Sequence, residues 1–299
     1  MGNGYTTLAN RTRRIGDSSG EFNGKHATFH RPRPLDPLTE RSRRIWSAGD
    51  YDSISAGFRH EAEAFVDRLG LKANLDVLDA ACGSGNLTIP AARTNARVTG
   101  LDLVPSLLDQ AAMWSAREGV TVRFDEGSVE ELPYADGEFD VVMSMFGVMF
   151  AARPERVVSE LARVTRRGGR VALANWTAKG FVGQMLWKHL AYVPPPAGIA
   201  SPLLWGDEAA IGDRFGGDDW DVTTKLRTLR FRYPYTPAET AELFRVSYGP
   251  TIRTFDALDA ERRPQLAGAL VDHWTAHQRS EGRGTEVDSE YLEVIAIRR

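Results

Sequence analysis

Apolar residues of this chain follow two spacings, helical and strand-like, in alternation. Between Phe58 and Leu69 they recur every three or four positions and stop at Gly70, which predicts a helix that ends at a glycine cap. Short apolar runs and further helical patterns then alternate as far as Trp176. Predicted strands cover residues 75–80, 96–102, 120–124, 139–145 and 170–176, and predicted helices cover 86–92, 105–118 and 154–165, with a turn at 166–169.

Strands that alternate with helices are typical of a parallel sheet. Right-handed crossovers place helices on both faces of such a sheet, and its ligand crevice lies at the carboxyl ends of the strands. The sequence therefore predicts an α/β, Rossmann-like core whose functional residues follow the strands.

The pattern changes after Trp176. Glycine, proline and tryptophan are frequent up to residue 222, which indicates an insertion that covers the core as a lid. A strand over 224–233, helices over 237–248 and 256–278 and a last strand over 290–297 follow. The predicted organisation is an irregular basic arm over 1–45, the core over 46–176, the lid over 177–222, and further strands, helices and substrate cover over 223–299.

The charge balance argues against a nucleic-acid partner. The 299 residues include 37 Lys and Arg and 40 Asp and Glu, for a net charge of −3, whereas nucleic-acid-binding domains are usually strongly basic. Only the first 50 positions are basic, with nine Lys and Arg against five acids. The single cysteine, Cys82, cannot form an intramolecular disulfide and suits a reducing cytoplasm, and no apolar run is long enough for a membrane span.

A glycine-rich turn follows the first strand. Gly83 and Gly85 allow the backbone to approach a ligand closely, and a helix begins directly after them. A dinucleotide site prefers a third glycine or alanine where this chain has Thr88. Asp79, just before the turn, would repel a diphosphate and attract an ammonium or sulfonium group. The pattern therefore favours a nucleoside ligand that carries positive charge.

The ends of the other strands complete a nucleoside site. Asp102 stands 19 residues after Gly83, where a carboxylate can accept both ribose hydroxyls. Ser128 and the neighbouring backbone could hydrogen-bond an adenine edge, and Met145 and Phe146 follow the fourth strand.

Four ordered motifs resemble those of a known family. They read DAACGSG at 79–85, GLD at 100–102, GSVEELP at 127–133 and RGG at 167–169. They resemble the motifs of class I S-adenosylmethionine-dependent methyltransferases, in particular the small-molecule branch that includes the quinone-biosynthesis enzymes. The resemblance covers about residues 50–176 and the last strand. It implies a seven-stranded sheet with an antiparallel last strand, and S-adenosylmethionine as cofactor, which leaves as S-adenosylhomocysteine.

The resemblance also implies the cofactor contacts. The glycine loop would follow the amino-acid part, Asp102 would hold the ribose, and residues 127–129 would approach adenine. Many family members carry an acid where this chain has Ser128, so backbone groups or Glu130 would take that contact. The predicted cofactor-binding residues are Tyr51, Asp79, Ala81, Cys82, Gly83, Ser84, Gly85, Asn86, Asp102, Leu103, Gly127, Ser128, Val129, Met145 and Phe146.

Catalysis requires alignment of the methyl group with the acceptor and exclusion of water more than it requires a specific base. The candidates for a catalytic role are His189, Tyr51 and Tyr248, although a hydrogen-bonded structural role for His189 also agrees with its apolar surroundings. Candidate substrate residues are Trp187, Tyr192, Trp205 and Arg245, and no metal site is predicted.

These observations predict a cytoplasmic methyltransferase for a small aromatic or hydrophobic acceptor, with O-methylation placed ahead of C- or N-methylation. Two alternatives stay open. One is an RNA or protein methyltransferase that docks its substrate on the basic arm, and the other is a protein that binds the cofactor without catalysis. No feature of the sequence addresses the oligomeric state.

Overall fold

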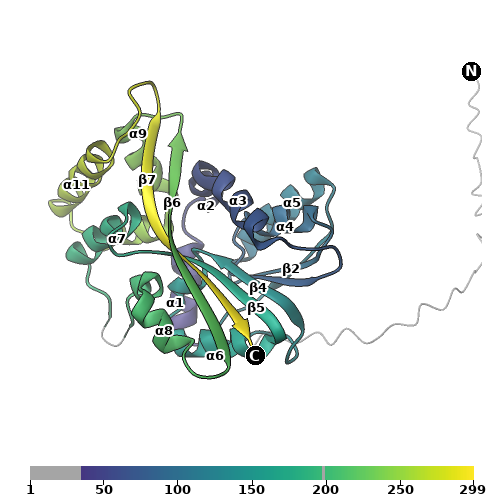
Figure 1. The fold of residues 1–299 in the computed structure, drawn as a ribbon. Coiled ribbons are helices and arrows are strands. Elements are labelled where there is room, and N and C mark those ends of the chain that lie inside the picture. The colour runs from purple at the N-terminus through teal and green to yellow at the C-terminus, as the bar shows by residue number, and fades with distance from the viewer. Residues whose placement is uncertain (1–34, 197–198) are drawn as a thin grey trace, which may run out of the picture. The chain divides into compact units, whose positions relative to one another are not determined.

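A mixed sheet organises the computed structural model, which describes residues 35–196 and 199–299 (Figure 1). Its strand order is β3-β2-β1-β4-β5-β7-β6. The strands are β1 (Asp76–Ala80), β2 (Arg97–Asp102), β3 (Val122–Glu126), β4 (Phe139–Met145), β5 (Thr165–Trp176), β6 (Trp220–Tyr233) and β7 (Thr285–Arg298). The first five are parallel, and β7 lies antiparallel between β5 and β6. The predicted seven-stranded, Rossmann-like sheet with an antiparallel last strand is confirmed.

Helices cover both faces of the sheet. Right-handed crossovers place α4 (Thr88–Arg93) and α5 (Pro105–Glu118) on one face and α6 (Pro154–Val164) on the other. The remaining helices are α1 (Pro37–Trp46), α2 (Tyr51–Ser55), η1 (Ala56–Phe58), α3 (Arg59–Leu69), η2 (Val148–Phe150), α7 (Phe181–Tyr192), η3 (Pro202–Gly206), α8 (Glu208–Arg214), α9 (Pro237–Ser247), α10 (Gly249–Asp256) and α11 (Arg262–Ala276). In the part of the chain that the structure describes, no helix has the length and apolar character needed to cross a bilayer.

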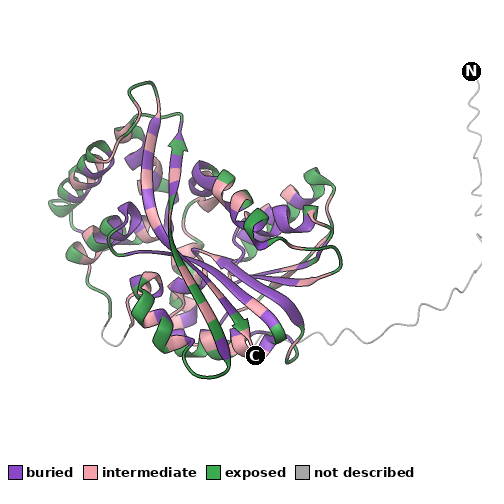
Figure 2. Cartoon of the chain, viewed as in Figure 1, coloured by how far each residue is buried: buried purple, intermediate pink, exposed green. Residues whose placement is uncertain are grey.

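The core lies along the middle strands. β1 and β4 are buried almost throughout, as parallel strands covered on both faces are, whereas the edge strand β6 has exposed residues along its length (Figure 2). Residues Asp36–Arg299 form one compact unit, which contains the segments predicted as core, lid and cover.

Helix α1 corrects the predicted irregular arm over 1–45, of which residues 1–34 lie outside the described ranges. Asp36 caps this helix, with its Oδ1 accepting the N–H of Leu38 at 3.0 Å, and Pro37 occupies the first helical position. The helix is rich in arginine and has only three large apolar residues, so its apolar pattern is weak. Contacts with the rest of the unit stabilise it instead.

Two smaller predictions also need correction. Residues 166–169 do not form a turn before the strand. β5 already begins at Thr165, which pairs with Phe139, and Arg170 pairs with Val141, so the expected turn is a bulge within the strand. The predicted helix over 256–278 is the shorter α11, and α10, which lies directly before it, was not predicted. Pro264 is tolerated only in a first turn, and α11 accordingly begins at Arg262.

Candidate functional site

An open cavity lies at the carboxyl ends of β1, β2, β3 and β4, with about 950 Å³ of space when its opening to solvent is included. Each of these strand ends contributes a residue to the cavity wall: Asp79, Asp102, Gly127 and Met145. Of the fifteen residues predicted to bind the cofactor, all but Ser84 and Gly85 line this first cavity. The segments that the sequence analysis assigned to the strand ends therefore surround one cavity.

The glycine turn shapes one wall of the first cavity. Gly83 has a φ of 55°, and the ring of Tyr51 lies 3.6 Å from the position that a Cβ on Gly83 would occupy. Gly85, with a φ of 95°, packs against Ala111 and Ile89 and so joins the turn to helices α5 and α4. Ser84 is buried beside it. These two residues shape the turn without lining the cavity, and their contact with the cofactor stays a prediction.

Asp102 is held in position by the backbone. Its Oδ2 accepts the N–H of Gly83 at 2.8 Å and its Oδ1 accepts the N–H of Val104 at 2.9 Å. Burial raises the pKa of this carboxyl, whereas the backbone hydrogen bonds act in the opposite direction. The result is a rigid carboxylate at the edge of the first cavity.

Asp79 is more deeply buried and has no basic partner. Its Oδ2 accepts a 2.5 Å hydrogen bond from the hydroxyl of Thr88, and burial raises its pKa to about 7. Among the described residues, the walls of the first cavity carry three carboxylates and no lysine, arginine or histidine. A cationic group would therefore stabilise the charged form of Asp79. The sequence analysis counted Thr88 only as a missing glycine and did not find its role in holding Asp79.

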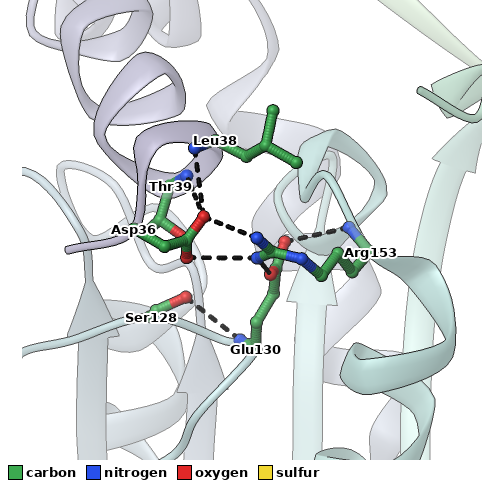
Figure 3. Close-up of polar contacts among 6 residues, drawn as sticks. All are labelled: Asp36, Leu38, Thr39, Ser128, Glu130 and Arg153. Carbon is green, nitrogen blue, oxygen red and sulfur yellow. Dashed lines mark hydrogen bonds and ion pairs between the residues drawn. The ribbon is translucent and has the colours of Figure 1, made fainter. Parts of the chain in front are cut away.

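Side-chain hydrogen bonds stabilise the turn after β3. Ser128 Oγ accepts the N–H of Glu130 at 3.2 Å (Figure 3). The carboxylate of Glu130 accepts a 2.9 Å hydrogen bond from the N–H of Arg153 and a 2.5 Å one from its guanidinium. Both Ser128 and Glu130 line the first cavity, but the charge of Glu130 is already paired.

Helix α1 forms the wall that the sequence analysis missed. Thr39, Ser42 and Trp46 line the first cavity, and their spacing of three and four positions puts them on one helix face. The signal that could have revealed the helix is its start, where a capping aspartate, Asp36, is followed by a proline at the first helical position.

A second, smaller cavity adjoins the first, with about 300 Å³ of space when its opening to solvent is included, and its walls are almost entirely apolar. It is lined by Trp46, Tyr51, Ile54, Phe58, Phe146, Phe150, Trp176, Val182, Met185, Phe231, Phe244 and Tyr248. The residues that line both cavities are all aromatic: Trp46, Tyr51, Phe58, Phe146 and Phe150. We call these five residues the aromatic boundary.

Phe146 of the aromatic boundary has an unusual backbone conformation. Its φ is 57°, which side-chain-bearing residues rarely adopt, and its ring stacks on Trp176 with 3.5 Å between ring centroids. Strained residues of this kind persist where the surrounding structure holds them, often at functional sites.

Comparison with known sequences decides the family. A family described as a methyltransferase domain matches residues 78–173. An uncharacterized protein of Mycobacterium tuberculosis is 38% identical over 230 residues, which make up 74% of this chain and 84% of that protein. A demethylmenaquinone methyltransferase of Tropheryma whipplei is 31% identical over 172 residues, which make up 56% of this chain and 70% of that protein. The chain belongs to the class I S-adenosylmethionine-dependent methyltransferases.

Solved structures agree with this family. The YcgJ protein of Bacillus subtilis, 18% identical, aligns with a TM-score of 0.56 over 80% of this chain and 99% of that chain, which shows the shared fold. A further relative by sequence is a ubiquinone/menaquinone biosynthesis C-methyltransferase of Bdellovibrio bacteriovorus. It is 35% identical over 149 residues, which make up 47% of this chain and 63% of that protein. S-adenosylmethionine is accordingly the cofactor of this methyltransferase.

The residues predicted to bind the methyl acceptor do not line either cavity. Trp187 is 51% exposed, and Arg245 pairs with Glu242 at the surface. Trp205 is buried under the guanidinium of Arg214, and Tyr192 lies under that of Arg262. The predicted lid contributes only Val182 and Met185 of α7 to the second cavity. Trp187, two positions beyond Met185, points to another side of that helix.

The three candidates for a catalytic role occupy different places in the structure. His189 lines neither cavity; its Nε2 lies 3.2 Å from the hydroxyl of Thr251, and burial lowers its pKa to about 4. The hydrogen bond at Nε2 agrees with a structural role, although the buried Nδ1 has no partner among the described residues. Tyr51 lies at the aromatic boundary and Tyr248 lines the second cavity, and burial raises the pKa of both phenols. Within residues 35–196 and 199–299, no group of His, Cys, Asp and Glu could hold a metal ion.

Proposed function

We propose that this methyltransferase transfers a methyl group to a small, oxygen-substituted ring compound bound in the second cavity. The observation that carries the proposal is the aromatic boundary, the set of five rings shared by the two cavities. A methyl group that passes from a cofactor in the first cavity to an acceptor in the second must cross this boundary.

The first cavity has groups that match the ammonium, the ribose and the sulfonium of S-adenosylmethionine. Asp79, buried without a basic partner, suits the ammonium group, and Asp102, fixed by two backbone N–H groups, suits the ribose hydroxyls. When bound, the cofactor supplies an electrophilic methyl group on a sulfonium. Aromatic faces next to a cation stabilise it by about 0.5–2 kcal/mol each, and Tyr51 and Trp46 stand at the boundary for this role.

The second cavity suits an apolar ring with a polar oxygen. Its wall residues are aromatic and aliphatic, and their polar groups are the hydroxyls of Tyr51 and Tyr248 and the indole N–H groups of Trp46 and Trp176. Neither hydroxyl hydrogen-bonds to another described residue. Each hydroxyl is therefore free to donate a hydrogen bond to an acceptor oxygen, which contributes about 0.5–1.5 kcal/mol. Because burial raises both pKa values, these phenols stay protonated and donate hydrogen bonds rather than accept a proton. They would orient the acceptor while the boundary excludes water.

The choice between oxygen and carbon as the methylated atom depends on the relatives. The analysis of the sequence placed O-methylation first. One relative is a C-methyltransferase of quinone biosynthesis, which favours a ring carbon, and another is a demethylmenaquinone methyltransferase, which favours a quinone-type ring as the acceptor. We therefore propose phenols and hydroquinones as the acceptor class, with a ring carbon as the preferred position.

The test combines binding with turnover. Calorimetry with S-adenosylhomocysteine establishes that the cofactor site is functional. A panel of phenols, hydroquinones and small amines is then incubated with methyl-labelled S-adenosylmethionine, and NMR of any product identifies the methylated atom. We expect labelled product from hydroquinones and phenols only. Turnover of amines alone would refute the acceptor class.

The two alternative functions have their own readout in the same experiment. A chain that lacks residues 1–34 is compared with the full chain on the small-molecule panel and on bulk RNA and protein. Salt-sensitive labelling of a macromolecule, lost on truncation, would favour docking on the basic segment, which lies outside the described residues. Cofactor binding without labelling of any acceptor would favour a non-catalytic protein.

A further inference from the structure

Helix α1 is fastened at both of its ends. At its N-terminal end, Asp36 contacts Arg153, which immediately precedes α6 (Figure 3). At its C-terminal end, the guanidinium of Arg253 on α10 donates a 3.0 Å hydrogen bond to the carbonyl of Arg44. The face between the two ends, which includes Trp46, lines the first cavity. The helix therefore spans the wall of the cofactor cavity between two attachments.

The attachment at Asp36 has two functions at once. The Asp36 carboxylate caps α1 by accepting the N–H of Leu38 at 3.0 Å and the hydroxyl of Thr39 at 2.6 Å. The same carboxylate accepts two hydrogen bonds from Arg153, of 2.5 and 3.1 Å. The Arg153 contact lowers the pKa of the Asp36 carboxyl, so the pair stays charged throughout the neutral range. The Asp36 side chain thus both caps α1 and connects it to Arg153 at the start of α6.

Arg153 holds its two carboxylates with unequal strength. The side chain of Glu130 is 6% exposed and also accepts the backbone N–H of Arg153, so this half of the contact is fixed. The side chain of Asp36 is 40% exposed, and ion pairs in contact with water are weak and sensitive to salt. The Asp36–Arg153 half is therefore the one that separates first.

We propose that Arg153 is a positioning residue that holds α1 closed over the bound cofactor, and that separation of Asp36 from Arg153 opens the first cavity for cofactor exchange. The proposal depends on the cofactor occupying that cavity, and it goes beyond the choice of acceptor. Because Trp46 belongs to both cavities, closure of α1 also completes the acceptor wall. Cofactor exchange and acceptor binding are thereby linked through one helix.

The chain offers closely matched variants for a test. Asp36→Asn keeps a good helix cap and removes the ion pair, because Asn caps helices as well as Asp does. Arg153→Gln removes the same pair from the other side, and Arg153→Lys keeps the charge without the paired geometry. Arg97→Gln is the control, since Arg97 forms a two-bond contact of 2.7 Å each with Asp76, which lines neither cavity.

The measurement is the rate at which S-adenosylhomocysteine leaves the protein, followed by stopped-flow tryptophan fluorescence. For Asp36→Asn and Arg153→Gln we expect dissociation about fivefold faster than in the unaltered protein, the upper range for a solvent-exposed ion pair. Association should also become faster, so that Kd changes less than the dissociation rate. The dissociation rate of Arg153→Lys should lie between that of the unaltered protein and that of Arg153→Gln. Arg97→Gln should change neither the dissociation rate nor the association rate.

Salt gives an independent readout. Added NaCl should accelerate dissociation from the unaltered protein and leave the rate for Asp36→Asn nearly constant, because that variant has no pair to screen. Unchanged dissociation in Asp36→Asn and Arg153→Gln, or an equal change in Arg97→Gln, would overturn the proposal. A change in Glu130→Gln with none in Asp36→Asn would do the same, since Arg153 would then act through the turn after β3. If the unaltered protein did not bind S-adenosylhomocysteine at all, the proposed function would fail first.

Discussion

The two cavities meet at the aromatic boundary but are built from different kinds of structure. The walls of the first come mainly from strand ends and the turns that follow them, and its polar groups are fixed by the backbone, as Asp102 is by Gly83. The walls of the second come from side chains far apart in the sequence, such as Ile54 and Phe231. Local motifs therefore build the cofactor site, whereas the tertiary packing of rings builds the acceptor site.

This difference predicts that substitutions around one cavity change the stability of the protein, whereas substitutions in the other change its affinity for the cofactor. The rings around the second cavity also belong to the hydrophobic core, so their truncation should destabilise the protein. The carboxylates of the first cavity make few apolar contacts, so their replacement should weaken cofactor binding instead. Four variants test this division, in order of expected effect.

Phe231→Ala should give the largest change. Phe231 is 2% exposed and its ring contacts those of Phe58 and Trp176. Removing a buried Phe side chain lowers the free energy of unfolding by about 3–5 kcal/mol, measured by urea denaturation. Leu226→Ala on the same strand is the control, because Leu226 is 53% exposed. Equal stability of the two variants would mean that the second cavity is not part of the core.

Asp102→Ala should act on cofactor affinity. Loss of the charge-assisted contacts to the ribose should weaken S-adenosylhomocysteine binding by about 1.5–3 kcal/mol, or roughly 10- to 150-fold in Kd. Calorimetry measures this change, and Asp109→Ala, an exposed residue on α5, is the control. An unchanged Kd for Asp102→Ala would remove Asp102 from the cofactor site.

The pH dependence of binding should report Asp79. Its pKa is raised to about 7, so the carboxyl gains a proton as the pH falls below 7 and can no longer pair with an ammonium group. The Kd of S-adenosylhomocysteine should therefore increase about tenfold between pH 8 and pH 6 and vary little above pH 8. In Asp79→Asn the affinity should be weak and independent of pH over this range. A flat profile for the unaltered protein would contradict the pairing.

The same shift has an effect on the ligand-free protein. Because the pKa of Asp79 in the folded protein lies above its unfolded value, this group reduces stability progressively as the pH rises from about 4 to 7. Bound cofactor should cancel that loss. Melting temperatures with and without S-adenosylhomocysteine should therefore diverge as the pH rises toward 7.

Tyr248→Phe should have the smallest effect, confined to the acceptor. Loss of one neutral hydrogen bond should raise the acceptor KM by a factor of about 2–10, or 0.5–1.5 kcal/mol, and leave the Kd of S-adenosylhomocysteine unchanged. Tyr235→Phe is the control, since Tyr235 is 45% exposed and lines neither cavity. A change in cofactor affinity in Tyr248→Phe would show that the division between the cavities is incorrect.

The sequence by itself determined the elements that depend on local periodicity. The bounds of α5 and β4 agree residue for residue with the predicted ones, because proline, glycine and an uninterrupted apolar pattern mark their ends. Residues directly after parallel strands must meet at one edge of the sheet, so Asp79 and Asp102 could be assigned to one crevice without a structure.

Only the tertiary structure decided what lies across that crevice. The role of Asp36 depends on Arg153, 117 positions away, and the second cavity joins Ile54 to Tyr248. Trp187 and Trp205 looked equally suited to bind an acceptor, yet one is exposed and the other is buried under an arginine. Composition cannot distinguish such residues, because the direction in which a side chain points is set by contacts between segments that no local pattern relates.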